Sequence, residues 1–173
     1  LITLGNNLNK IREDYEKYMK EKQMSLDKII AIILSIIEIC NFRIGTARCK
    51  EKYKTYGIST LIKRHVKIKS DTKMYVEFIG KKKQKNKCLI KDPQIILSLK
   101  QITRNISNNK DTLWTYKSNK GLKDVTALDI NNYLKKYDKT ITAKEFRTWS
   151  ANKLFISELL KFKTIPKTEK DRK

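Results

Sequence analysis

The chain has 173 residues, enough for one domain with a proper core and at most two small ones. Its 40 Lys and Arg against 18 Asp and Glu give a formal net charge of +22, which favours a polyanionic partner. A membrane partner is disfavoured, because the most apolar run, residues 29–39, is too short to span a bilayer and contains Glu38. No signal peptide is expected, since the start lacks a basic region followed by an apolar stretch.

Two helices are predicted at the N-terminal end. Between residues 8 and 22, apolar side chains recur at near-helical spacing with charges between them, which is typical of an amphipathic helix. Ser25 is then an N-cap for residues 26–40, whose apolar content predicts the central buried helix. The polar stretch that follows, residues 46–56, is interpreted as a short helix plus loop.

A small sheet is predicted next, because the apolar period changes to two. Apolar and charged residues alternate over residues 65–69 and again over 73–79, with a turn at 70–72 between them. A third short strand, residues 88–91, follows the lysine-rich turn 80–87. These segments predict three antiparallel strands.

The rest of the chain is expected to be helix and loop. Asp92 caps a helix that begins with Pro93 and continues to about Thr103, and residues 105–124 are expected to be loop. Two capping-box sequences follow, and they open helices over residues 126–137 and 142–162. The tail, residues 164–173, is expected to be disordered. The order predicts one domain of the α+β class, mainly α, with a small three-stranded antiparallel sheet.

The three cysteines, Cys40, Cys49 and Cys88, are odd in number, widely spaced and without a CxxC pair. This pattern argues against a disulfide framework and against zinc, and predicts three ordinary thiols in a reducing compartment. The acidic residues show no metal-binding spacing either. We therefore expect no metal and no cofactor.

Four positions carry basic or titratable groups that need an interpretation. The lysine-rich turn is either a solvated hairpin tip or a basic hairpin that reaches DNA phosphates, and composition alone favours the first. Arg147 lies in the first turn of a helix that should be buried, so it needs a partner, such as the carboxylate of Asp129 or Glu145. Arg43 precedes Gly45, where a close backbone turn would let its guanidinium point into a cleft.

His65 is the only histidine, so triad catalysis would have to use it. It shares a predicted strand face with Lys67 and Lys69, and no nucleophile-elbow motif is present. A surface or DNA-facing histidine is the better interpretation.

Four short motifs occur in a fixed order and cover, with their flanks, about residues 4–162. They are Phe42-Arg43-Ile44-Gly45, residues 56–61 leading to His65-Val66, Phe78-Ile79-Gly80-Lys81, and residues 142–149 with Phe146-Arg147-Thr148-Trp149. Together they resemble the type IB DNA topoisomerases of poxviruses, giant viruses and bacteria. The resemblance implies the fold shared with tyrosine recombinases, duplex DNA as substrate and supercoil relaxation as activity. In such enzymes a tyrosine attacks a phosphodiester to form a 3′-phosphotyrosyl link, and the reverse attack reseals the strand.

The resemblance also implies roles for individual residues. Arg43 and Arg147 match the two arginines that hydrogen-bond the scissile phosphate, a task that suits planar guanidinium forks. Lys81 matches the general acid for the leaving 5′-oxygen. The further DNA contacts that we expect are Lys144, Lys82, Lys83, Arg64, His65 and Lys67.

The chain departs from the family pattern in three places. Lys82 stands where many relatives have Asp, and Cys49 stands where they have an aromatic residue. The family's phosphate-binding histidine and nucleophilic tyrosine follow the last motif, but no His or Tyr follows Arg147 here. We therefore expect a partial catalytic domain over residues 1–173, incomplete at its C-terminus and inactive alone, rather than a degenerate homologue.

The expected partner is duplex DNA, bound inside the cell by a monomer without membrane or small-molecule cofactor. Three alternatives stay open at this point. The chain is a non-catalytic basic DNA-binding module, a tyrosine-recombinase relative, or an RNA binder that acts through charge.

Overall fold

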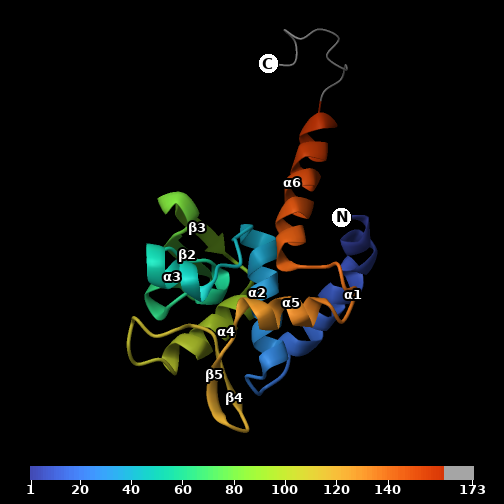
Figure 1. Ribbon diagram of the computed structural model, residues 1–173. Helices are drawn as coiled ribbons and strands as arrows, with labels where there is room; N and C mark the ends of the chain where they lie inside the picture. Colours follow the sequence, from blue (N-terminus) through green and yellow to red (C-terminus); the bar gives the residue numbers. More distant parts are fainter. Residues whose placement is uncertain (162–173) are drawn as a thin grey trace.

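Helix α2 (Leu26–Cys40) runs through the middle of the structure, a computed structural model that describes residues 1–161 (Figure 1). Its sequence makes this position necessary, because the side chains from Ile29 to Leu34 are at most 1% exposed. The Ser25 hydroxyl caps the helix by accepting from the Lys28 amide at 3.1 Å, as predicted. The helix ends at Asn41, which adopts a left-handed conformation. The predicted disorder of residues 164–173 lies outside the described residues.

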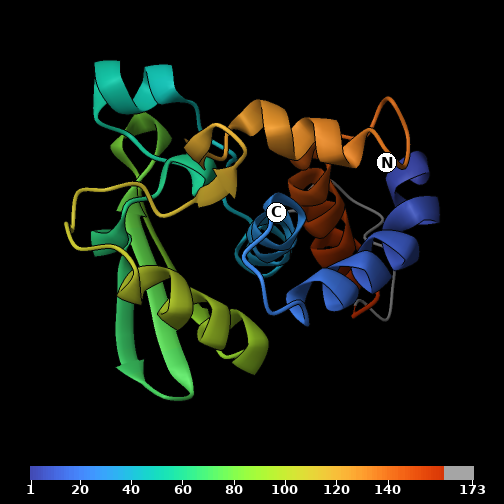
Figure 2. The same cartoon turned by 90° about the horizontal axis from the view of Figure 1, so that it is seen from below.

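Helix α1 (Ile2–Met19) packs on one side of α2, and the sheet lies on the other (Figure 2). The helix begins earlier than the predicted residues 8–22, since Leu4 and Leu8 already belong to its buried stripe. The stripe continues through Ile11 and Tyr15 at helical spacing. An ion pair between Arg12 and Glu38 adds a polar link between α1 and α2.

The sheet contains β1 (Val66–Ser70), β2 (Lys73–Ile79) and β3 (Lys85–Ile90) in the antiparallel order β1-β2-β3. The predicted three-stranded sheet is confirmed, although β3 begins before the predicted residue 88. Alternate side chains of β2 enter the core, and Val76 in the middle of that set is fully buried. The sheet therefore presents one apolar face to α2 and holds β3 at an edge.

Helix α3 (Ala47–Tyr53) confirms the predicted short helix. Helix α4 (Pro93–Arg104) begins at the predicted cap, where the Asp92 carboxylate accepts from an amide of the first turn at 2.9 Å. The predicted loop 105–124 is partly wrong, because it contains a hairpin of β4 (Thr115–Ser118) and β5 (Gly121–Asp124). The hairpin lacks apolar alternation, so no periodic signal marked it.

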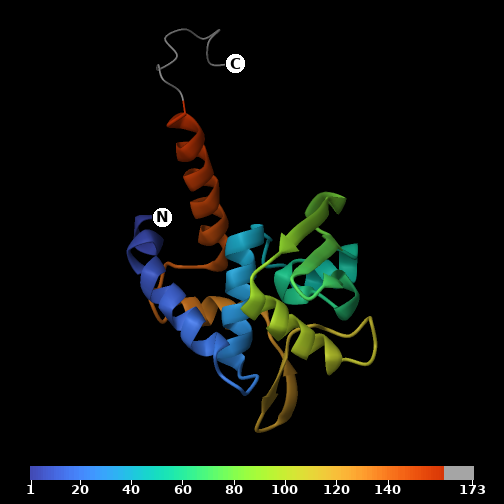
Figure 3. The same cartoon turned by 180° about the vertical axis from the view of Figure 1, so that it is seen from behind.

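Helices α5 (Ala127–Leu134) and α6 (Ala143–Leu159) both open with the predicted capping boxes, and both end earlier than predicted. The expected burial of α6 is wrong. The helix projects away from the body of the protein (Figures 1 and 3), and its second half exposes Leu154 and Phe155 by 62% and 61%. Only Ala143 and Phe146 of this helix are buried. Apolar composition predicted a buried helix, but no described element covers its outer turns.

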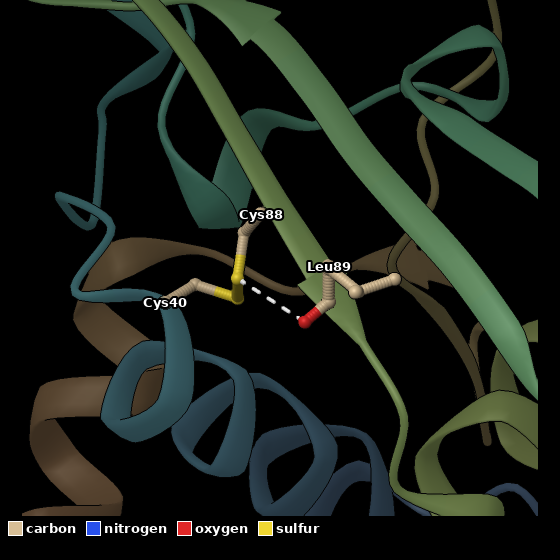
Figure 4. The surroundings of a disulfide bond; sticks show 3 residues. All are labelled: Cys40, Cys88 and Leu89. Carbon is tan, nitrogen blue, oxygen red and sulfur yellow. Dashed lines mark hydrogen bonds between the residues drawn. A yellow bond between two sulfur atoms is a disulfide. The ribbon is translucent and has the colours of Figure 1, made fainter.

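The prediction of three free thiols is also wrong. Cys40, at the end of α2, and Cys88, in β3, form a disulfide with a Cα–Cα distance of 5.6 Å (Figure 4). Of the cysteines, only Cys49 is free. The pair is separated by 48 positions in sequence, so nothing in its spacing indicated that the fold brings the two residues together.

Candidate functional site

Arg43 is held by two backbone segments that approach closely. Its carbonyl accepts from the Ile58 amide at 2.8 Å, and the Ile44 carbonyl accepts from the Ser59 amide at 2.8 Å. The approach requires glycine, because a Cβ on Gly45 would lie 2.7 Å from the Gly57 Cα. Gly45 also has a φ of +79°, in the left-handed region that favours glycine. The Arg43 side chain therefore extends from a backbone segment whose position is fixed.

Lys81 lies at the start of the β2–β3 connection, in the 3-10 turn Lys81–Lys83. The turn is tight, because the Gly80 amide donates to the Gln84 carbonyl at 2.8 Å and both Lys82 and Lys83 have positive φ. The three lysine side chains are exposed. Because the ends of the turn are hydrogen-bonded to each other, the backbone that carries the three lysines has a fixed conformation.

Arg147 lies in the second turn of α6, and its Nε donates to the backbone carbonyl of Asn41 at 2.6 Å. The expected carboxylate partners are used elsewhere, since Asp129 accepts from Thr126 and Glu145 from Thr142 in the two capping boxes. That expectation was therefore wrong. The carbonyl fixes one edge of the guanidinium, and no ion pair of Arg147 occurs among residues 1–161.

The two arginines lie close enough to influence each other. Burial, and after it the positive charge of Arg43, lower the pKa of Arg147. Like charges brought together without a counter-charge are unfavourable unless an anion binds between them. Two adjacent guanidiniums of this kind are suited to bind an anion.

One cavity of about 950 Å³ collects these groups. Arg43, Lys81 and Arg147 line it from three separate parts of the chain, and among residues 1–161 no Asp or Glu belongs to its lining. The other basic side chains that line it are Lys52, Lys82, Lys83 and Lys144. The structure thus brings together the three predicted catalytic residues and three of the six further predicted DNA contacts.

The remaining predicted DNA contacts lie elsewhere. Arg64 and Lys67 line a separate cavity of about 370 Å³, together with Arg104 and Lys63. The described residues that line this second cavity also include no Asp or Glu. It is therefore a second basic surface, distinct from the one around Arg43.

His65 does not have the expected surface position, because its side chain is only 6% exposed. Its Nδ1 accepts from the Ile62 amide at 3.2 Å, and its ring packs edge-on against Tyr56 at 4.4 Å. Burial, followed by the charges of Arg64 and Lys67, lowers the pKa of His65 to about 4. The residue belongs to the 3-10 turn Lys63–His65 and not to β1, so the strand alternation did not apply to it.

Sequence reasoning missed three contributors to the site, Asn41, Lys52 and Tyr53. Asn41 supplies its backbone carbonyl to Arg147, and its left-handed conformation at the helix end turns that carbonyl toward α6. Asn tolerates this conformation, which was the one available signal. Lys52 and Tyr53 line the cavity together with Cys49, the residue that stands where the family has an aromatic side chain. The described residues contain no group of three or more side chains suited to hold a metal ion.

Comparison with known proteins agrees with the motifs. A family model described as the eukaryotic DNA topoisomerase I catalytic core matches residues 1–173. The chain is 32% identical over 153 residues to the DNA topoisomerase 1B of Acanthamoeba polyphaga mimivirus, and 30% identical over 151 residues to the DNA topoisomerase 1 of Candidozyma auris. It is 26% identical over 168 residues to the DNA topoisomerase 1 of Mycosarcoma maydis.

These alignments include most of this chain but little of some relatives. The first covers 85% of this chain and 44% of the viral protein, and the second covers 87% of this chain and 19% of the fungal protein. The chain therefore spans less than half the length of these curated relatives. Among the described residues, no helix combines the length and apolar character needed to cross a membrane.

Proposed function

Since the chain belongs to the type IB DNA topoisomerase family, we propose that it is part of a catalytic domain that binds duplex DNA and presents Arg43, Lys81 and Arg147 to one phosphodiester. One observation carries the proposal. These three residues come from distant positions in the sequence and line a single cavity, to which the described part of the chain contributes no acidic residue. A DNA phosphate supplies the negative charge that this cavity lacks.

The two arginines hold the phosphate. Each guanidinium can donate two parallel hydrogen bonds to phosphate oxygens, and their charge stabilises the extra negative charge of the pentacoordinate transition state. The Asn41 carbonyl occupies the Nε of Arg147, which leaves the two terminal nitrogens for the phosphate. This contact orients the fork before DNA binds.

Lys81 supplies the proton of the cleavage step. A tyrosine phenolate oxygen bonds to phosphorus, the bond between phosphorus and O5′ breaks, and the Lys81 ammonium transfers its proton to the leaving O5′. Religation is the reverse, so Lys81 regains its proton as O5′ attacks. The tight hairpin supports this role, because it holds the ammonium at the rim of the same cavity.

We assign the attacking tyrosine to none of the phenols in this chain, because the family's nucleophile follows the last motif and all eight tyrosines here, including Tyr53 and Tyr56 at the cavity, precede Arg147. Burial raises the pKa of Tyr15 and of Tyr133, which stabilises the neutral phenol against the phenolate that attacks phosphorus. The Tyr137 hydroxyl donates to the Asp14 carboxylate of α1, and Tyr137 does not line the cavity. The chain alone is therefore expected to bind DNA and not to relax it.

Lys144, Lys82 and Lys83 extend the proposed contact to neighbouring phosphates, because they line the same cavity. Arg64 and Lys67 would contact phosphates farther along the duplex from the second basic cavity. His65, next to Arg64 in the sequence, is buried and neutral, so we assign it no direct phosphate contact. We further propose that the chain acts inside the cell, where duplex DNA is present, and as a monomer.

Binding of a labelled duplex at several salt concentrations tests the proposal. Neutralisation of some six phosphates predicts a slope of log affinity against log salt of about −5. Arg147→Gln should weaken binding about tenfold or more, as expected for the loss of a charge-assisted hydrogen bond. Lys10→Gln, which removes the same charge from the exposed surface of α1, is the matched control and should change affinity far less.

A plasmid assay separates binding from cleavage. We expect the chain to retard supercoiled plasmid and to leave its supercoils intact in the absence of magnesium and ATP. Relaxation by the chain alone would contradict our assignment of the nucleophile, and a flat salt response would contradict the phosphate site itself.

A further inference from the structure

We propose that the Cys40–Cys88 disulfide is a redox-sensitive clamp that positions Lys81 against Arg43 and Arg147. The inference rests on the proposed function, because it concerns the regulation of the same cavity. It assigns both cysteines as positioning residues, since neither lines the cavity itself.

The clamp joins the two parts of the chain that carry the site (Figure 4). Cys40 is the last residue of α2, directly before Asn41, whose carbonyl holds Arg147, and three positions before Arg43. Cys88 lies in β3, opposite Val76 of β2, in the hairpin whose turn contains Lys81. The bond thus ties the segment that positions both arginines to the hairpin that positions the proposed general acid.

Besides the shared core, which Ile90 of β3 enters at the end of the strand away from the turn, two named contacts hold the hairpin in place. The Tyr56 amide donates to the Ile79 carbonyl at 2.8 Å, and the rings of Phe42 and Phe78 pack edge-on at 4.8 Å. Both contacts act on β2. Among the described strands, β3 pairs with β2 alone, and Cys88 supplies its covalent bond to α2. Reduction should therefore leave the sheet folded and loosen β3 with the turn before it.

The bond is reachable by small molecules, because both cysteines are only partly buried. Inside cells thiols are kept reduced, and the disulfides that do form there are mostly transient and redox-sensing. The reduced state also has a place for the thiol hydrogen. The Cys88 Sγ lies 3.9 Å from the Leu89 carbonyl oxygen, a contact that a thiol can use as donor and a disulfide sulfur cannot (Figure 4).

The chemistry of the switch is thiol–disulfide exchange with a small-molecule disulfide such as glutathione disulfide. One cysteine thiolate attacks that disulfide and releases one small thiol, and the second cysteine then attacks the mixed disulfide and releases the other. Two electrons and two protons pass from the protein to the small disulfide. Reduction by excess small thiol reverses both steps.

Alkylation followed by intact-mass analysis shows whether the bond forms. The protein is equilibrated in glutathione buffers of defined ratio, quenched in acid, and alkylated after denaturation. We expect one alkylated cysteine, Cys49, in oxidising buffer and three in reducing buffer, with a two-electron midpoint between them. Three alkylated cysteines at every ratio would overturn the proposal.

The same two states then report on positioning. After reduction we expect faster amide hydrogen exchange in the turn at residues 80–84. Duplex DNA affinity should weaken by about fivefold, which is at the low end of the affinity changes that one site typically causes at another. The Cys40→Ser/Cys88→Ser double variant should resemble the reduced protein in both buffers. Cys49→Ser should keep the redox response, since Cys49 takes no part in the bond.

The outcomes separate the clamp from the proposed function. Equal exchange and equal DNA affinity in the two states, with the bond demonstrated by mass, would overturn the clamp. A response of the wild type that persists in the double variant would overturn it as well. Absence of DNA binding in both states would instead contradict the proposed function, and hydrogen exchange at the turn would still decide whether the bond positions it.

Discussion

Gly45→Ala tests how the backbone beneath Arg43 is fixed. The substitution adds a Cβ that would lie 2.7 Å from the Gly57 Cα and 2.8 Å from its nitrogen, which are backbone atoms that cannot rotate away. Relief of this overlap must separate the two segments. Such overpacking costs about 1–3 kcal/mol, and the two backbone hydrogen bonds that the Ile58 and Ser59 amides donate across this contact contribute about 0.5–1.5 kcal/mol each.

Gly121→Ala is the matched control for this prediction. Gly121 also has a positive φ, +102°, but a Cβ there would meet nothing within 4 Å. Both variants therefore carry a backbone cost of about 1 kcal/mol, and Gly45→Ala alone carries the packing cost. At about 2–4 °C per kcal/mol for a chain of this size, Gly45→Ala should melt about 10 °C below the control.

Thermal unfolding followed by circular dichroism measures the difference. Duplex DNA affinity measured below both melting temperatures should also fall for Gly45→Ala, because the displaced backbone carries Arg43. Equal melting temperatures for the two variants would refute the close approach as the reason for glycine at residue 45.

Three further predictions concern the rest of the fold. The resonance of the single histidine, His65, should titrate near pH 4 by NMR, and a midpoint near 6.5 would refute its burial. Because the folded pKa of His65 lies below its ordinary value of 6.5, about 3 kcal/mol of folding stability should be lost as the pH falls from 6.5 to 4. Phe146→Ala should lower the free energy of unfolding, measured in urea, by about 3–5 kcal/mol, whereas Leu154→Glu on the exposed part of α6 should change it by less than about 0.5 kcal/mol. Equal losses of unfolding free energy would show that the outer part of α6 is buried. Tyr137→Phe removes the hydroxyl that donates to Asp14 and should cost about 1–2 kcal/mol in the same assay, while an unchanged unfolding midpoint would exclude that contact.

Features that depend on local sequence were predicted well. Ser25, Asp92 and the capping boxes at Thr126 and Thr142 each act within one helical turn, so the residues that specify them are adjacent in the chain. The burial of α2 at the centre was predictable, because a long apolar helix in a domain of this size can be shielded from water only in the core.

Features that depend on contacts across the chain were not predicted. The apolar residues of α6 indicated burial, but burial requires a covering partner, and composition cannot show whether one is present. The Cys40–Cys88 bond depends on how α2 lies beside β3, which spacing does not encode. His65 was misplaced because a 3-10 turn before β1 moves it out of the strand alternation.

The candidate site shows the same division. Arg43, Lys81 and Arg147 were indicated by short motifs, and the fold brings them to one cavity. The contact that orients Arg147 could not be predicted, because its acceptor is the backbone carbonyl of Asn41, a group that every residue has. Sequence indicated carboxylate partners for this arginine, and both proved to be occupied by helix caps.

Arginine side-chain NMR during titration with a short duplex tests the central claim most directly. The Nε–H signals of Arg43 and Arg147 should shift together and saturate at the same DNA concentration, because we propose that both guanidiniums bind the same phosphate. Arg12, whose Nε donates to Glu38 at 2.9 Å and which lies outside the cavity, should keep its signal and serves as the internal control. DNA binding that shifts other arginines and leaves Arg43 and Arg147 unchanged would contradict the phosphodiester site.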